Sequence, residues 1–234
     1  MMATTESSSE RASKSGGTLD ESLPGSAVSF AGTATSPTVI DATRRWLERA
    51  VIGLNLCPFA RAVHRRRQIR YVVSSATDRE TLAVELTAEL LHLQTTSAET
   101  VDTTLLIHPL VLTDFYDYNA FLTSANRIVE RLGLDGEIQV ASFHPQYEFA
   151  NCQADAVDNN TNRSPWPMLH LLREASITKA VAAFPDADDI YLRNIDTMRA
   201  LGPAGWLALD VGANSQPHPG ALPATDATDA PDAA

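Results

Sequence analysis

The apolar positions of this chain repeat with two different periods, and the change of period predicts alternating helices and strands. Leu82, Leu86, Leu90 and Leu93 recur every three or four residues, which places them on one face of a helix. Short uninterrupted runs of aliphatic and β-branched residues are instead typical of buried strands. Such runs occupy residues 69–74, 103–108 and 137–143.

Capping residues and helix breakers set the limits of the predicted helices. A polar side chain before an apolar periodic segment accepts the first free backbone N–H groups, and glycine or proline ends the segment. On this basis helices are predicted over residues 38–54, 78–93, 114–132, 165–176 and 190–201. The candidate caps are Thr38 with Asp41, Thr77 or Asp78, and Thr113 or Asp114.

The order of these elements predicts the fold class. Strand–helix–strand–helix–strand favours right-handed crossovers and a small, mostly parallel sheet with helices packed on it, an α/β fold. The alternative is a ferredoxin-like α+β fold with a further strand within residues 143–157. We expect a single globular domain over residues 38–209. The flanking segments, 1–37 and 210–234, are rich in small and polar residues, and we expect both to be disordered.

Composition excludes several classes of protein. No apolar run reaches the ~18–20 residues of a membrane span, and two cysteines are too few for a disulfide framework. The start of the chain lacks the basic and apolar regions of a secretory signal, so we expect a soluble cytoplasmic protein. Eighteen basic and 29 acidic residues give a net charge of −11, which argues against general nucleic-acid binding.

The arginines are concentrated in one segment. Residues 44–70 contain eight of them against a single acid, Glu48. Two interpretations stay open: these arginines pair internally with acidic residues such as Asp186, Asp188 and Asp189, or they form a pocket for an anion. The planar guanidinium group suits either carboxylate or phosphate.

Two of the predicted strands end in the same dipeptide, His108-Pro109 and His144-Pro145. If these strands are parallel, both histidines leave the same edge of the sheet, where open α/β folds bind ligands. Proline holds the residue before it in an extended conformation. The long polar stretch 144–164 that follows is uncommon in a compact domain unless it is functional.

The polar stretch continues into a segment with further candidate groups. On the predicted helix 165–176, His170 and Glu174 are four residues apart and share a face, an arrangement that suits a metal, a proton relay or a plain helix pair. The helix start, with Ser164 and Arg173 nearby, also suits an anion.

A third candidate lies after the first helix. Cys57 is followed by Arg61 and His64, and positive neighbours lower the pKa of a thiol and make it nucleophilic. We therefore expect Cys57 to have a pKa below the free value. The alternative is a small buried apolar side chain.

Three blocks together resemble a known family. They are Gly-Leu-Asn-Leu-Cys-Pro-Phe-Ala (53–60), Phe-His-Pro-x-Tyr-x-Phe (143–149) and Thr-Asn-Arg-Ser-Pro-Trp-Pro-Met-Leu-His-Leu-Leu-Arg-Glu (161–174). In this order they are similar to the bacterial and plastid family called domain of unknown function fourteen-fifteen. Trp166 stands where a tyrosine is expected. The resemblance covers residues 38–207 and implies that the blocks belong together, with no activity attached.

Three functions stay open. An enzyme acting on a small anionic metabolite would use Cys57 as nucleophile, His144 as general base, and His170 with Glu174 as a relay. A metal- or cofactor-binding protein would use the same four side chains, whose mixed donors favour zinc or iron. A non-catalytic binding or assembly module would dock an acidic partner on the arginine-rich segment. The candidate ligand-binding residues are Asn55, Arg61, Tyr147, Asn162, Arg163, Ser164 and Arg173.

Overall fold

A four-stranded sheet lies at the centre of the fold. The computed structural model describes residues 35–150, 152–182 and 189–213. The strands are β1 (Ile69–Val73), β2 (Thr103–Ile107), β3 (Ile138–Phe143) and β4 (Met168–Arg173), in the spatial order β1-β2-β4-β3. β1 and β2 are parallel, whereas β4 is antiparallel to both of its neighbours.

The position of β4 corrects two predictions. Residues 168–173 form a strand and not the predicted helix, and the sheet has one parallel pair and two antiparallel pairs instead of being mostly parallel. The physical reason is that helices cover both faces of the sheet, so Leu169 and Leu171 are buried on one face of β4 and Met168 on the other. A short, mostly apolar segment of this kind cannot be distinguished from a buried helix by periodicity. The further strand lies here and not within residues 143–157.

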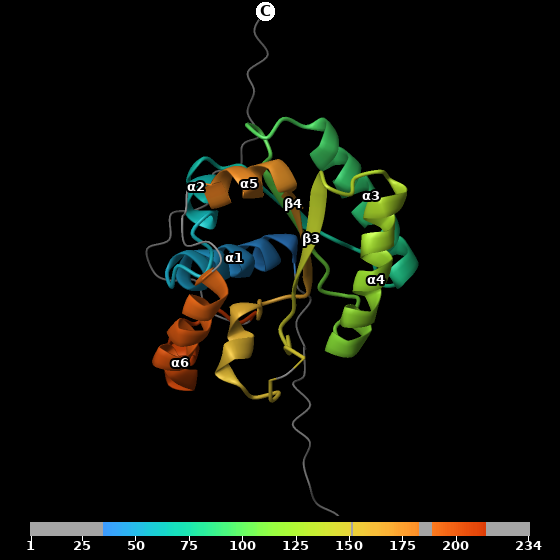
Figure 1. Cartoon of the computed structure of the whole chain (residues 1–234). Helices are drawn as coiled ribbons and strands as arrows, with labels where there is room; N and C mark the ends of the chain where they lie inside the picture. Colours follow the sequence, from blue (N-terminus) through green and yellow to red (C-terminus); the bar gives the residue numbers. More distant parts are fainter. Residues whose placement is uncertain (1–34, 151, 183–188, 214–234) are drawn as a thin grey trace, which may run out of the picture. The chain divides into compact units, whose positions relative to one another are not determined.

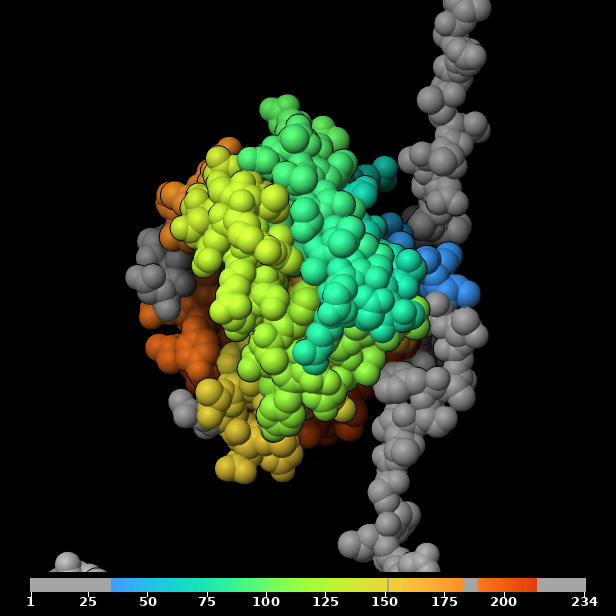
Figure 2. Space-filling model, turned by 90° about the vertical axis from the view of Figure 1, so that its right-hand side faces the viewer, coloured from blue at the N-terminus to red at the C-terminus, as the bar shows by residue number. Residues whose placement is uncertain are grey.

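Two helices cover one face of the sheet. They are α3 (Arg79–Thr95) and α4 (Phe115–Arg131). Figure 2 shows the face of the molecule that these two helices form. The leucine face of α3 is buried, as predicted. In the core on this side, the α3 leucines pack with Leu106 of β2 and with Leu169 and Leu171 of β4. Along each strand these residues alternate with residues that point to the opposite face of the sheet.

The opposite face is covered by α1 (Ser36–Trp46) and the π-helical turn η1 (Leu47–Ile52) that continues it (Figure 1). Trp46 and Ala50 pack here against Leu105, Ile107 and Met168 of the sheet. The protein is therefore an α/β fold with helices on both faces.

Further elements complete the fold on the side of α1 (Figure 1). They are α2 (Ala60–Arg65), the 3₁₀ turn η2 (Val157–Thr161), α5 (Glu174–Ala182) and α6 (Ile190–Ala208). α6 continues past the predicted end at Gly202-Pro203 through a kink, where Gly202 has φ 65°. No helix among the described residues is long and apolar enough to cross a membrane.

The described ends differ slightly from the predicted limits. α1 begins at Ser36, and Val211, which the prediction assigned to the C-terminal tail, is buried against the α1 core. The segments predicted to be disordered otherwise fall on residues 1–34 and 214–234, which lie outside the described residues.

Candidate functional site

The two His-Pro sites lie at the same edge of the sheet, as predicted. β2 and β3 run in the same direction because each is antiparallel to β4. The ring of Tyr118, from α4, contacts both imidazoles, with centroid distances of 5.7 Å to His108 and 5.1 Å to His144. The three rings form one buried cluster at the ends of β2 and β3.

Both imidazoles are neutral and support one turn of the chain. Burial lowers the pKa of each from 6.5 to about 4. His108 Nδ1 lies 2.9 Å from the carbonyl oxygen of Val111, and His144 Nε2 lies 3.2 Å from that of Leu112. The other ring nitrogen of His144 accepts the N–H of Gln146 at 3.0 Å. With both nitrogens engaged, His144 has no lone pair free to act as a general base.

The Tyr118 hydroxyl is a structural partner that the sequence analysis missed. It donates to the carbonyl of Met168 at 2.8 Å and accepts the N–H of Phe143 at 3.1 Å, so it joins β4 to the end of β3. In the sequence Tyr118 is recognisable only as a residue on the apolar face of the helix that Asp114 caps, which does not indicate a partner for its hydroxyl.

The polar stretch 144–164 is ordered by its own side chains. Asn159 is fully buried; its Oδ1 accepts the N–H of Phe149, and its Nδ2 donates to the carbonyl of Gln153. The Tyr147 ring packs on Phe115 at 5.2 Å. These contacts hold the loop against itself and against α4.

The candidate anion-binding residues of this stretch are engaged in the same way. Arg163 donates to the backbone carbonyls of Tyr147 and Ala154, at 3.2 and 2.6 Å. Asn162 donates to the carbonyl of Ser142, and the Ser164 hydroxyl to that of Trp166. The second and third sequence blocks therefore come together, but their donors bind the chain itself.

The first block forms a local turn on the other face of the sheet. A Cβ at Gly53 would lie 2.1 Å from the carbonyl oxygen of Arg49, and Asn55 has φ 55°. Arg61 donates to the carbonyl of Ile52 at 3.2 Å. Cys57 packs against the α1 core, and burial raises the pKa of its thiol. The expected lowering of this pKa is therefore wrong, because the burial outweighs the hydrogen bonds to the sulfur.

The segment after Trp166 also differs from the prediction. His170 points from the centre of β4 toward Phe143, with Nε2 2.7 Å from the Thr103 hydroxyl, and burial lowers its pKa to about 4. Glu174 is the first residue of α5, so the helical i,i+4 pair with His170 does not exist. Arg173 donates to the carbonyls of Leu93 and Thr96 at the end of α3.

The candidate ligands do not form a metal site. Across the described ranges, no three His, Cys, Asp or Glu side chains are grouped so that they could hold an ion. Cys57 lies with α1 on one face of the sheet, whereas His144 contacts Tyr118 and Phe115 on the other. The residues present do not fit zinc or iron as proposed from the sequence.

A cleft of about 400 Å³ opens elsewhere, between the β1–α3 and β2–α4 loops. Both loops follow the carboxyl ends of the parallel strands. Residues 77–80 line one wall and residues 110–114 with Asp117 the other. Asp78 caps α3 by accepting the Thr81 N–H, and Asp114 caps α4 by accepting those of Tyr116 and Asp117. The caps were predicted, but the cleft between them was not.

The cleft has an acidic lining and an apolar side. Four carboxylates line it, at Asp78, Glu80, Asp114 and Asp117, with one cation, Arg79, which pairs with Asp117 at 2.6 Å. Leu110 is 56% exposed beside them. The wall formed by residues 110–114 is hydrogen-bonded to the buried histidines: His108 contacts the carbonyl of Val111, and His144 contacts that of Leu112.

Fold and site together define an α/β domain with a polar, self-bonded loop at one sheet edge and an open cleft beside it. A family model described as Protein of unknown function (DUF1415) matches residues 38–208, so the chain belongs to this family. Comparison with curated proteins finds no match. Comparison with solved structures finds none either.

Proposed function

We propose that the protein is a non-catalytic binding domain that takes a positively charged ligand in the cleft between the β1–α3 and β2–α4 loops. The observation that carries the proposal is the lining of this open cleft, where four carboxylates, at Asp78, Glu80, Asp114 and Asp117, face a single cation, Arg79. The side chains expected to be catalytic, by contrast, bond to their own backbone or lie on opposite faces of the sheet.

The charge of the cleft determines the class of ligand. Arg79 neutralises Asp117, and backbone N–H groups satisfy one oxygen of Asp114. Glu80 and the remaining carboxylate oxygens keep the cleft negative, which favours an ammonium or guanidinium group. Leu110 supplies apolar surface for the stem of such a side chain. The small anionic ligand expected from the sequence fits this lining less well.

The proposal assigns no reaction to the protein. Binding of a basic side chain or a small amine requires no nucleophile. The two cysteines are free thiols, a state that suits action in the reducing cytoplasm.

An NMR titration with arginine amide, lysine amide and glutamate amide tests the proposal. We expect the two basic probes to shift backbone amides of residues 77–80 and 110–117, and glutamate amide to leave them unchanged. Asp117→Asn and Glu80→Gln should each weaken binding about threefold to tenfold, since each removes one charge near the ligand. Glu130→Gln, on the exposed side of α4 and outside the cleft lining, is the matched control.

Two results would contradict the proposal. Shifts at the cleft with glutamate amide alone would favour the anionic ligand. Shifts confined to residues 143–164 would mean that the ligand binds the polar loop, and they would favour the enzymatic interpretation again.

A further inference from the structure

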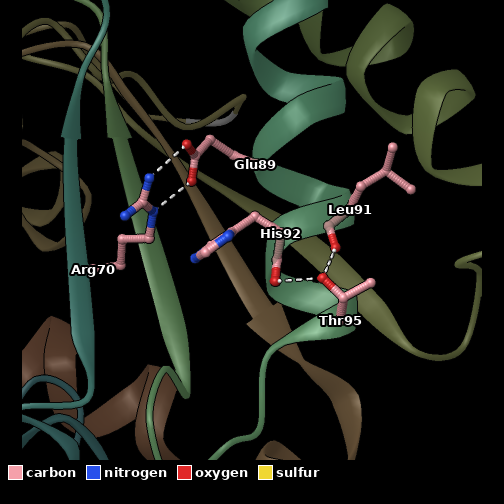
Figure 3. Close-up of polar contacts among 5 residues, drawn as sticks. All are labelled: Arg70, Glu89, Leu91, His92 and Thr95. Atoms are coloured by element: carbon pink, nitrogen blue, oxygen red, sulfur yellow. Dashed lines mark hydrogen bonds and ion pairs between the residues drawn. The ribbon is translucent and has the colours of Figure 1, made fainter.

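Two groups of arginines in the described part of the chain differ in their partners. The first group has carboxylate or backbone partners that fix each side chain across the fold. Arg70 of β1, for example, makes a bidentate ion pair with Glu89 of α3, at 2.8 and 3.0 Å (Figure 3). Arg49, Arg79, Arg199, Arg163 and Arg173 are held in comparable ways by Asp210, Asp117, Asp158 and backbone carbonyls.

The second group lies on α2 and the turn after it. Arg61, Arg65, Arg66 and Arg67 are all exposed, and none forms an ion pair with a residue that the structure describes. Arg61 donates only locally, to the backbone carbonyl of Ile52 nine residues before it. Arg66 bonds to the side-chain oxygen of Gln68, a neutral group. We call these four residues the α2 arginine surface. Of the acids considered as internal partners, Asp186 and Asp188 lie outside the described residues.

One of the four occupies a position that favours a different residue. Arg67 has φ 57°, in the left-handed region, where it ends α2 with its N–H on the carbonyl of His64 at 3.0 Å. Glycine is the usual residue at such a helix end, because a Cβ atom is strained at positive φ. The local fold therefore does not call for arginine at position 67, and a role for its charge outside the fold accounts for it better.

We propose that the α2 arginine surface docks a short acidic peptide segment of a partner protein. Guanidinium groups bind carboxylates through two parallel hydrogen bonds, and four of them on neighbouring turns match a segment with several Asp or Glu residues. This surface is independent of the cleft between the β1–α3 and β2–α4 loops, and it carries the opposite charge.

Two observations favour an acidic peptide over a nucleic acid. Residues 60–67 contain no Phe, Tyr or Trp side chain on which a base could stack. The chain as a whole carries a net charge of −11, which repels a long polyanion. A short acidic segment stays close to the arginines. Salt screens its repulsion from acidic residues of the protein that lie more than about 8 Å away.

Fluorescence anisotropy on the full chain tests this proposal, with a labelled acetyl-(Asp-Glu)₃-amide peptide as the probe. We expect binding that weakens at least tenfold between about 50 mM and about 300 mM NaCl, because the contact is electrostatic. Arg65→Gln should weaken binding about threefold to tenfold. Arg67→Gly should do the same while leaving the protein equally or more stable, since glycine suits the positive φ.

The control is Arg127→Gln with Arg131→Gln, two exposed arginines on α4, and it should bind the peptide like the unaltered chain. Three results would overturn the proposal. They are no peptide binding at low salt, an equal loss of binding in the α4 control, and tighter binding of a single-stranded oligonucleotide that the peptide does not displace. The stability of Arg65→Gln is measured alongside, and a clear loss would show that this arginine pairs internally and belongs to the first group.

Discussion

The polar loop 144–164 and the cleft between the β1–α3 and β2–α4 loops are both rich in polar side chains but use them in opposite ways. In the loop, Asn159, Asn162 and Arg163 direct their polar atoms at backbone groups of the chain. In the cleft, Glu80 and Asp117 are exposed at a surface hollow. A dense group of polar residues in a sequence therefore marks a structural loop as readily as a binding site, and partners decide between the two.

The largest expected effect is a dependence of stability on pH. His108 and His144 are fully buried, and their pKa values, like that of His170, fall from 6.5 to about 4 on folding. Between pH 6.5 and 4 the unfolded chain binds more protons than the folded one, so stability is complete above pH 6.5 and is lost as the pH falls through this window. Each histidine contributes a slope of about 1.4 kcal/mol per pH unit.

Urea unfolding at several pH values between about 4.5 and about 7.5 measures this slope. His144→Gln should reduce this slope by the contribution of one histidine. The control is His92→Gln, on the exposed side of α3, which should leave the slope unchanged. A slope unchanged by His144→Gln would mean that this imidazole has the same pKa in the folded and the unfolded chain.

The second effect is on the polar loop itself. Arg163→Ala removes the donors to the carbonyls of Tyr147 and Ala154, and we expect it to lower the free energy of unfolding by about 2–3 kcal/mol. Denaturant unfolding measures this loss. Arg199→Ala, which breaks an exposed ion pair with Asp158, should cost less than about 1 kcal/mol. Unaltered stability in Arg163→Ala would mean that its two hydrogen bonds to the loop do not stabilise the fold.

The smallest effect is on the cleft. Glu80→Gln should change the free energy of unfolding by less than about 0.5 kcal/mol, because the side chain is exposed and the α3 cap is made by Asp78. The same unfolding measurement checks it. A larger loss would place Glu80 among the structural residues and weaken the contrast between the cleft and the loop.

Local signals in the sequence were enough to predict much of the fold. The three strands first expected, 69–74, 103–108 and 137–143, agree with β1, β2 and β3 to within one residue, because turn residues bound their apolar runs. Asp78 and Asp114 act as helix caps as predicted. β4 was missed because Pro165 and Pro167 resemble the start of a helix, and because burial of both its faces removes the alternation that marks a strand.

The candidate site was harder to predict because it depends on contacts between distant residues. The sequence correctly joined His108 and His144 at one edge, since strand direction alone decides this. It could not show that Arg163 reaches the carbonyl of Ala154, or that two capped loops far apart in the sequence enclose a cleft. Burial of Cys57 likewise depends on the α1 core and not on its charged neighbours.

The place of β4 in the sheet has a consequence for synthesis on the ribosome. β4 is the last strand of the sheet in chain order, yet it separates β2 from β3. While the chain is being made, β2 and β3 have no common partner until residues 168–173 emerge, so each presents an open hydrogen-bonding edge. The nascent protein is therefore most exposed to wrong pairing just before this strand is complete, and any factor that protects it would act in that interval.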